Sequence, residues 1–437
     1  MSILESLTRF CWVDNGGITR AKAAWHSNLA GALRFGVGLS MAQQAIPMMS
    51  DTLVAETGLS PVGEVRLHAD LETLTKLPFA PHSSMVLGDM RLLSGEAWGH
   101  CPRSFLKNQV QAAAALGFEV CASFENEFFL FNADDTPLDS SNYATLGAFN
   151  DASTVIIEIL ESLEAAGLIP EMYYPESGTG QHEISIVPSY GVKAADQQVI
   201  FKAIVHGVAA KHGLKASFAA KPILETAGSG CHLHLSLWQS GRNAFYAPDG
   251  LEKLSRVAYQ SIAGVLKHLP GLCALTVPSV NSYRRLQPGW WAGAYNCYGL
   301  DNREAAVRVA SSHLLHNADS SGKSTNFELK TCDASANPYI ALGGLIAVVL
   351  DGIRLQLEPP EALNVSPSSL SADQRAARGI QALPNSLEEA LQHLQQNTVL
   401  NNALGDLATS YVAVRQTEAT YFAAHPEEEL MRHRYVY

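Results

Sequence analysis

Hydrophobic and polar residues alternate strictly in the stretch GCHLHLSLW, residues 230–238. Successive side chains of a β-strand point to opposite faces, so this pattern predicts a strand with two unlike faces. One face carries a cysteine and three leucines, and the other carries His232, His234 and Ser236. Such a strand packs its apolar face on a core and leaves the ionisable face open.

The stretch SFENEFFLF, residues 123–131, predicts a second strand, yet it places Glu125 and Glu127 on the same face. Its four phenylalanines favour burial. Two neighbouring like charges repel each other, and a buried carboxylate without a partner is costly. That face is therefore either open to water or in contact with a cation.

Three shorter stretches show the same division into an apolar and an ionisable face. QHEISIV places Glu183 with Ser185, AAVRVA places Arg308 between valines, and NFELKT places Glu328 with Lys330. Together these strands predict a sheet whose polar face mixes carboxylates, histidines and basic groups.

Helical patterns separate the strands. Apolar residues at helical spacing, ended by a glycine, predict helices at residues 103–117, 151–167 and 194–213. The run YIALGGLIAVVL, residues 339–350, is too short to span a bilayer and predicts a buried core helix. The region from Leu387 onward is mostly helical in pattern.

The first hundred residues have a different character. Two strand-like runs flank the Asn-Gly-Gly sequence at residues 15–17, which predicts a β-hairpin, and short runs with turns follow. A length of 437 residues favours two domains. We therefore expect an α+β protein with a small strand-rich domain at residues 1–98 and a second domain at residues 99–437.

Composition limits the classes of function. Hydrophobic residues make up 47% of the chain, which allows a large core, and the net charge of −12 argues against a nucleic-acid or acidic-membrane partner. Seven scattered cysteines without a CxxC pair favour a reducing compartment. The N-terminal residues show no secretion-signal pattern. We expect a soluble cytoplasmic enzyme that binds neither nucleic acid nor membrane.

The polar face of the predicted sheet offers ligands for metal ions. A solvated sheet face is the plain alternative, but that alternative does not account for His-x-His and Glu-x-Glu on neighbouring strands. Carboxylate oxygens with one imidazole suit Mg²⁺ or Mn²⁺ better than zinc. The candidate ligands are Glu125, Glu127, Glu176, Glu183, His232 and Glu328. Such cations would also neutralise the repulsion within the Glu-x-Glu pair.

Arginines complete the set of candidate groups. NSYRRLQPGWW and DNREAAVRV supply Arg284, Arg285, Arg303 and Arg308. Arginines beside metal ligands commonly hold phosphate or carboxylate, and with divalent ions they suit phosphoryl transfer from ATP. The sequence contains neither GxxxxGK[ST] nor GxGxxG, so it indicates neither a P-loop nor a Rossmann fold. A surface salt bridge remains the alternative for any single arginine.

These residues lie in motifs that resemble the glutamine synthetase family. The motifs follow the family's order across residues 101–437: FENEFF, ESGTGQHE, KPILETAGSGCHLHLSL, NSYRRLQPG, DNREAAVRV and FELKTCDASANPY. The match is much weaker in the first hundred residues. The resemblance implies a β-grasp N-terminal domain and a catalytic domain whose curved antiparallel sheet lines a funnel. It also implies a ring of subunits, commonly a dodecamer, with sites between neighbours.

The resemblance further implies a two-step reaction that uses ATP and two or three Mg²⁺ or Mn²⁺ ions per site. ATP phosphorylates the γ-carboxylate of glutamate, and an amine then displaces phosphate to give a γ-amide. The ions neutralise phosphate charge, and arginines stabilise the transferring group.

The motifs imply a role for each matching residue. Glu127, Glu176 and Glu183 match a first metal site, and Glu125, His232 and Glu328 match a second. The matches to nucleotide contacts are Glu171, His234, Ser236, Arg308 and Lys323. The matches to contacts of the amino-acid substrate are Gly228, Arg285 and Lys330. The catalytic candidates are Arg303, on the transferring phosphoryl group, with Arg285 and Glu328.

The chain departs from the family on the side of the site that receives the amine. The family's aspartate-containing N-terminal loop has no acidic counterpart in RFGVGLSMAQQ, residues 34–44. Trp291 stands where the family has a glutamate that closes the ammonium site, and Trp290 adds aromatic surface beside it. Lys330 replaces an arginine on the substrate carboxylate, which keeps the charge and loses the two-point fork.

We therefore expect a γ-glutamyl amide ligase that uses an organic amine, whether alkyl, aromatic or polyamine. One alternative is a true glutamine synthetase whose ammonium site uses another acid, such as Asp51. The other is a catalytically silent structural member. The chain retains all six candidate metal ligands as well as Arg303 and Arg308, which argues against a catalytically silent protein.

Overall fold

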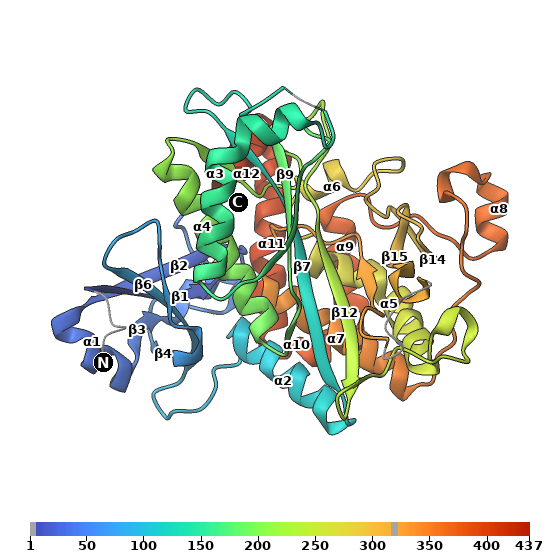
Figure 1. Cartoon of the computed structure of the whole chain (residues 1–437). Helices are drawn as coiled ribbons and strands as arrows, with labels where there is room; N and C mark the ends of the chain where they lie inside the picture. The colour runs from blue at the N-terminus through green and yellow to red at the C-terminus, as the bar shows by residue number, and fades with distance from the viewer. Residues whose placement is uncertain (1–5, 141, 316–321) are drawn as a thin grey trace.

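The computed structural model describes residues 6–140, 142–315 and 322–437. Among these residues the strands form two sheets, and helices lie against the larger sheet (Figure 1). This mixture of helices and strands confirms the predicted α+β class. The domain boundary at residue 98 stays a prediction.

The smaller sheet is mixed and has the strand order β2–β1–β6–β4–β3, with β5 beside β6. Its strands are β1 (Leu7–Val13), β2 (Thr19–Trp25), β3 (Val37–Ser40), β4 (Glu64–Ala69), β5 (Thr75–Lys76) and β6 (Ser83–Arg91). The antiparallel pairing of β1 with β2 confirms the predicted hairpin, and β1 pairs with β6 in parallel. This hairpin, with helix α1 and the later strands, forms the expected β-grasp-like unit.

Helix α1 (His26–Phe35) has no counterpart among the sequence predictions. Leu29 is buried, and Ala32 and Leu33 pack against the same small core, so the apolar stripe at helical spacing is only one turn long and gives a weak helix signal. Short 3₁₀ helices η1 (Met41–Ala45), η2 (Ala55–Thr57) and η3 (Leu71–Thr73) occupy the connections after β3 and β4. Residues 34–44, which correspond to the family's acidic loop, therefore cover the end of α1, β3 and most of η1.

The larger sheet has the order β14–β15–β16–β12–β7–β9–β8, with β10 and β11 beside β7 and β13 beside β12. Its pairs are antiparallel except for β14 with β15, which is the one departure from the expected antiparallel sheet in the described residues. The strands are β7 (Glu119–Phe131), β8 (Pro170–Pro175), β9 (Gln181–Ile186), β10 (Ser189–Tyr190), β11 (Lys215–Ser217), β12 (Cys231–Gln239), β13 (Arg242–Asn243), β14 (Tyr295–Leu300), β15 (Ala305–Val309) and β16 (Phe327–Leu329).

The helices of this part confirm the predicted helical segments. They are α2 (Pro102–Ala115), α3 (Leu146–Ala165), α4 (Lys193–Lys211), α5 (Arg256–Thr276), α6 (Ser282–Arg285), α7 (Pro338–Arg354), α8 (Ala372–Ala377), α9 (Leu387–Gln396), α10 (Thr398–Leu404), α11 (Asp406–Ala424) and α12 (Pro426–Val436). The 3₁₀ helices η4 (Leu251–Lys253), η5 (Ser311–Leu314) and η6 (Pro367–Ser369) lie between them. Helix α3 begins at Leu146, earlier than the predicted Asp151, because the buried face already includes Ala148.

The apolar face of the larger sheet packs on helices and closes the core. The ring of Phe128 on β7 lies 6.4 Å from that of Phe201 on α4. Asn126 and Gln198 exchange two hydrogen bonds of 2.8 and 2.7 Å across the same interface. Helix α7 is buried along almost its whole length, which confirms the predicted core helix. Because this face is occupied, the ionisable residues line the opposite face.

One further feature of the fold concerns membranes. Within the described ranges, no helix combines the length and the hydrophobicity that a membrane crossing requires.

A buried ion pair connects α11 with the N-terminal part of the chain. Arg415 is fully buried, and its Nη1 donates to Glu418 Oε2 at 2.8 Å and to the Tyr437 hydroxyl at 3.2 Å. Glu418 Oε1 in turn accepts the backbone N–H of Met48 at 2.8 Å. We expect Arg415→Ala to lower the free energy of unfolding, measured by urea titration, by about 3–5 kcal/mol. The reason is that a buried carboxylate loses its counter-ion.

The control is Arg256→Ala, whose nearest carboxylate lies 3.9 Å away in an exposed pair. This change should cost less than about 0.5 kcal/mol. Equal costs for the two variants would contradict the structural role of the buried pair.

Candidate active site

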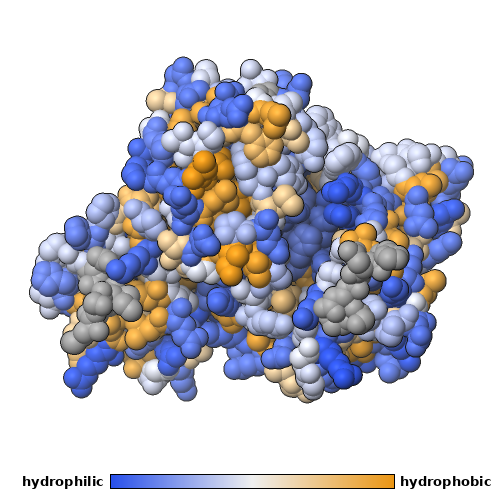
Figure 2. Space-filling model, in the orientation of Figure 1, coloured by the Kyte–Doolittle hydropathy of each residue, from blue (hydrophilic) through white to orange (hydrophobic). Residues whose placement is uncertain are grey.

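Strand register brings the predicted metal ligands together on one face of the larger sheet. Glu125 of β7 lies opposite His232 of β12, and Glu127 of β7 lies opposite Glu183 of β9. Directly opposite residues in a sheet share a face. Figure 2 shows a hollow with hydrophilic lining on the side of β12 that faces β14 and β15. Glu125 and His234 on this face are half-buried, whereas Glu127, Glu183, His232 and Glu328 are buried.

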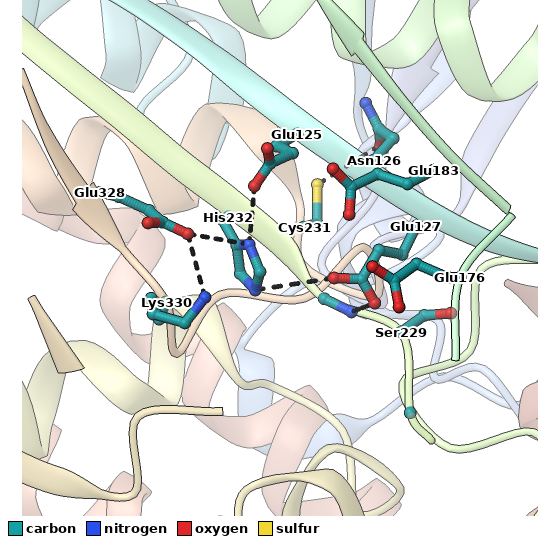
Figure 3. Close-up of polar contacts among 12 residues, drawn as sticks. Glu125, Asn126, Glu127, Glu176, Glu183, Ser229, Cys231, His232, Glu328 and Lys330 are labelled. Atoms are coloured by element: carbon teal, nitrogen blue, oxygen red, sulfur yellow. Dashed lines mark hydrogen bonds and ion pairs between the residues drawn. The ribbon is translucent and has the colours of Figure 1, made fainter. Parts of the chain in front are cut away.

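His232 stands at the centre of the second predicted metal set (Figure 3). Its Nδ1 lies 2.9 Å from Glu125 Oε2 and 3.0 Å from Glu328 Oε1. Its Nε2 lies 3.8 Å from Glu127 Oε1. Mg²⁺ demands octahedral geometry, which separates neighbouring ligand atoms by about 3 Å. The distances from His232 to Glu125 and Glu328 are hydrogen-bond and ion-pair distances, and they are also compatible with ligands of one small divalent ion.

Glu328 is fully buried and is the most heavily paired acid of the site. Its Oε1 lies 3.1 Å from Lys330 Nζ, and its Oε2 accepts from Arg308 Nη1 at 2.7 Å. Burial alone would raise the pKa of Glu328, but Lys330 and His232 lower it well below its usual range. Glu328 is therefore negatively charged and can bind a cation.

The first predicted metal set consists of Glu127, Glu176 and Glu183, whose carboxylates point toward one another in Figure 3. Burial, followed by the charges of Glu125 and Glu127, raises the pKa of Glu183 to about 11. Burial and the charge of Glu127 likewise raise the pKa of Glu176. So many carboxylates cannot all ionise without a counter-charge.

The donor set therefore fits divalent cations that prefer oxygen. Five carboxylates and one imidazole suit Mg²⁺ or Mn²⁺, which would supply the missing positive charge. A second imidazole is also within reach, because ligand atoms of Glu125, His234 and Glu328 lie within 4.8 Å of one another. The assignment of single residues to particular ions stays a prediction.

Four of the five predicted nucleotide contacts line one cavity of about 490 Å³. They are Glu171, His234, Ser236 and Lys323. Glu125 also lines this cavity, so the cavity adjoins the candidate metal ligands. The fifth residue, Arg308, is not among the lining residues and pairs with Glu328. The role of all five in binding ATP stays a prediction.

The predicted contacts of the amino-acid substrate lie close to the candidate metal ligands. Arg285 of α6 is buried and donates to the carbonyl oxygens of Thr331 at 3.1 Å and Lys330 at 3.0 Å. A Cβ on Gly228 would lie 2.5 Å from the carbonyl oxygen of Ala220 and 3.0 Å from Arg285 Cγ. Only glycine fits there, so this segment can pack directly on the arginine.

The loop between α6 and β14 carries the two tryptophans that distinguish the chain. Trp290 is 51% exposed and Trp291 is 61% exposed. Lys221 Nζ lies 4.0 Å from the centre of the Trp290 ring, and Arg303 Cζ lies 5.9 Å from that of Trp291. The structure therefore places exposed aromatic surface beside Arg303.

Comparison with known proteins agrees with this geometry. The family described as "Glutamine synthetase, catalytic domain" matches residues 99–434, and the "Glutamine synthetase N-terminal domain" matches residues 4–98. The chain belongs to the glutamine synthetase family. It is therefore an ATP-dependent carbon–nitrogen ligase of the glutamine synthetase type.

Individual relatives of this glutamine synthetase family member differ in their substrates. The chain is 35% identical to the γ-glutamylpolyamine synthetase GlnA3 of Streptomyces coelicolor, over 93% of this chain and 88% of that protein. It is 37% identical to the glutamine synthetase of Halobacterium salinarum, over 85% and 83% of the two chains. A solved complex of GmaS with ADP superposes with a TM-score of 0.85 at 28% identity, covering 97% and 95%.

The sequence predictions missed two residues that support the candidate metal ligands of this family member. Gln181 Nε2 donates to Glu127 Oε2 at 3.0 Å, and the Tyr174 hydroxyl donates to Glu183 Oε1 at 2.5 Å. Gln181 is two residues before Glu183 on the same strand, so the strand period could have indicated it. Tyr174 lies opposite Glu183 on β8, a relation that only strand pairing reveals.

A third missed residue is Glu304, which lies between Arg303 and β15. Its carboxylate accepts the backbone N–H groups of Gly289 and Trp291. No periodic signal in the sequence links residue 304 to residues 289 and 291, because the contact arises from the folding of two loops.

Proposed function

We propose that this family member is an ATP-dependent ligase that forms a γ-glutamyl amide from glutamate and an organic amine through γ-glutamyl phosphate. The observation that carries the proposal is the exposed Trp291, whose ring lies 5.9 Å from Arg303. Arg303 is the residue that we assign to the transferring phosphoryl group. The amine that attacks the acyl phosphate then approaches along an aromatic surface.

The remaining residues supply the first step of this reaction. ATP binds in the cavity lined by His234 and Ser236, next to Glu125. Divalent ions, when bound by the carboxylates, neutralise phosphate charge and orient it. Arg303 stabilises the charge on the transferring group, and Arg285 with Lys330 holds the glutamate. We propose two or three Mg²⁺ or Mn²⁺ ions per site.

Aromatic surface favours an organic amine for a physical reason. Selective binding of ammonium needs carboxylates that hold its charge and remove a proton. Trp291 occupies the position of one such acid, and it favours apolar or aromatic groups through contact area. The relative GlnA3, described as a γ-glutamylpolyamine synthetase, supports an organic amine as the acceptor. Because other relatives are glutamine synthetases, ammonia is the alternative acceptor.

The test is a phosphate-release assay with ATP, glutamate and one amine at a time. The panel comprises ammonia, methylamine, isopropylamine, ethanolamine, putrescine and aniline. We expect kcat/KM for at least one organic amine to exceed that for ammonia at least tenfold. We expect Trp291→Glu to shift the preference toward ammonia, because the new carboxylate can hold ammonium, whereas Trp291→Phe should not. Ammonia as the best acceptor of the unaltered enzyme would make the protein a glutamine synthetase.

We also propose that the chain assembles into a homo-oligomeric ring with active sites between subunits. Membership of the family supports this proposal. A neighbouring N-terminal domain would then complete the side of the site that receives the amine.

A further inference from the structure

Glu304 holds the tryptophan loop through both oxygens of its carboxylate. Oε1 accepts the backbone N–H of Trp291 at 3.0 Å, and Oε2 accepts that of Gly289 at 3.2 Å. The side chain is only 9% exposed. Hydrogen bonds to an ionised, shielded carboxylate are among the stronger ones in proteins. These two bonds enclose Trp290 and fix the backbone on either side of it.

The loop needs such a restraint because its backbone is unfavourable. Trp291 has a φ of +56° and Gly289 has a φ of +82°. A positive φ suits glycine but strains a bulky residue, so it persists only where neighbouring groups enforce it. The hydrogen bond from Trp291 N–H to Glu304 is made at the strained residue itself.

The segment that carries Glu304 is itself anchored. Asn302 Oδ1 accepts the backbone N–H of Glu304 at 3.1 Å. Asn302 Nδ2 donates to the carbonyl oxygens of Leu363 at 2.7 Å and Val365 at 3.0 Å. Arg303 lies between Asn302 and Glu304 in the sequence. One fixed segment therefore positions both Arg303 and the tryptophan loop.

Charge around the loop bears on the class of amine. Lys221 lies over the ring of Trp290, and Arg303 lies near the ring of Trp291. The charge of Glu304 is directed to backbone N–H groups. A second ammonium beside these rings would meet these two cations, whose charge Glu225 and Asp301 offset in part, whereas an apolar amine body would meet only aromatic surface.

We propose that Glu304 is a positioning residue that holds Trp290 and Trp291 as the wall of the amine site, and that this wall selects a monoamine with an apolar or aromatic body. The proposal rests on the proposed function, since it specifies the acceptor of that reaction. Glu304 acts through the loop and does not touch the reacting atoms.

The first test measures the loop directly by hydrogen exchange of its amides. In Glu304→Gln one of the two acceptor oxygens becomes an N–H₂ donor, which in the same orientation faces one of the two backbone N–H groups. We expect the amides of Gly289 and Trp291 to exchange at least tenfold faster in this variant. The control Glu361→Gln changes an exposed acid outside this loop and should leave them unchanged. Unchanged exchange in Glu304→Gln would overturn the positioning role.

The second test separates acceptor binding from phosphoryl transfer. In Glu304→Gln we expect KM for isopropylamine and aniline to rise at least tenfold, while KM for ATP stays within twofold. Glu304→Asp keeps the charge and should recover part of the loss. Faster amide exchange without any change in amine KM would overturn the link to specificity.

The kcat/KM values of the wild-type enzyme for the amines test the monoamine class and the proposed function. A kcat/KM for putrescine tenfold above that for isopropylamine and aniline would overturn the monoamine class. A preference for ammonia over every amine would overturn the proposed function, and the exchange measurement would still decide whether Glu304 holds the loop.

Discussion

Glu328→Gln should lower kcat by roughly a thousandfold or more and weaken the binding of Mn²⁺ to the enzyme. The side chain is fully buried and meets His232, Lys330 and Arg308 within 3.1 Å. Glutamine keeps the shape of the side chain but loses the charge that would hold a divalent ion. Without that ion, the phosphate charge on ATP stays uncompensated. A thousandfold loss corresponds to about 4 kcal/mol of transition-state stabilisation. Steady-state phosphate release and Mn²⁺ titration measure the two effects.

A matched control lies on a strand of the same sheet. Glu119 begins β7 and is exposed, so Glu119→Gln should change kcat less than about twofold. Full turnover by Glu328→Gln in excess chelator would refute the metal assignment. Loss of Mn²⁺ binding with normal turnover would refute its role in catalysis.

Arg303→Ala should lower kcat by about a thousandfold while KM for glutamate and ATP changes less than about threefold. An arginine that contacts a transferring phosphoryl group acts mainly in the transition state, and such residues commonly contribute factors of this size. Steady-state kinetics with each substrate varied in turn give the two parameters separately. Arg303→Lys keeps the charge and should retain part of the activity.

Two comparisons make the arginine prediction specific. Arg256→Ala removes an exposed arginine elsewhere and should leave kcat within about twofold. Because Arg303 also lies 5.9 Å from the Trp291 ring, the ratio of kcat/KM between isopropylamine and ammonia should be measured in Arg303→Ala. A rise in KM for ATP alone would show that Arg303 binds the nucleotide and does not stabilise the transfer.

The amino-acid sequence by itself determined which side chains share a face. Alternation in residues 230–238 placed His232 and His234 on the polar side of a strand, and the structure has β12 at that place. Alternation likewise placed Glu125 with Glu127 on β7. This succeeds because the side-chain period of a strand is a local property of the backbone. Glycines after helical runs marked helix ends for the same reason, since a positive φ is a local requirement.

The tertiary structure decided which strands meet and how they are aligned. A period of two gives a face, but it does not say that Glu125 lies opposite His232 or that Glu328 lies opposite His234. A shift of one residue would send each carboxylate to the buried side, so burial of the whole apolar face selects the register. That selection involves strands far apart in sequence, and no local pattern contains it.

The loops depended on tertiary structure most of all. The sequence identified Trp291 as a departure from the family, but it did not show that the ring is exposed beside Arg303 or that its φ is positive. Nor did it connect Glu304 with the N–H groups of residues 289 and 291. Strand and helix patterns repeat, so short windows of sequence carry them. Loop contacts have no period, and their partners are fixed only when the surrounding elements have packed.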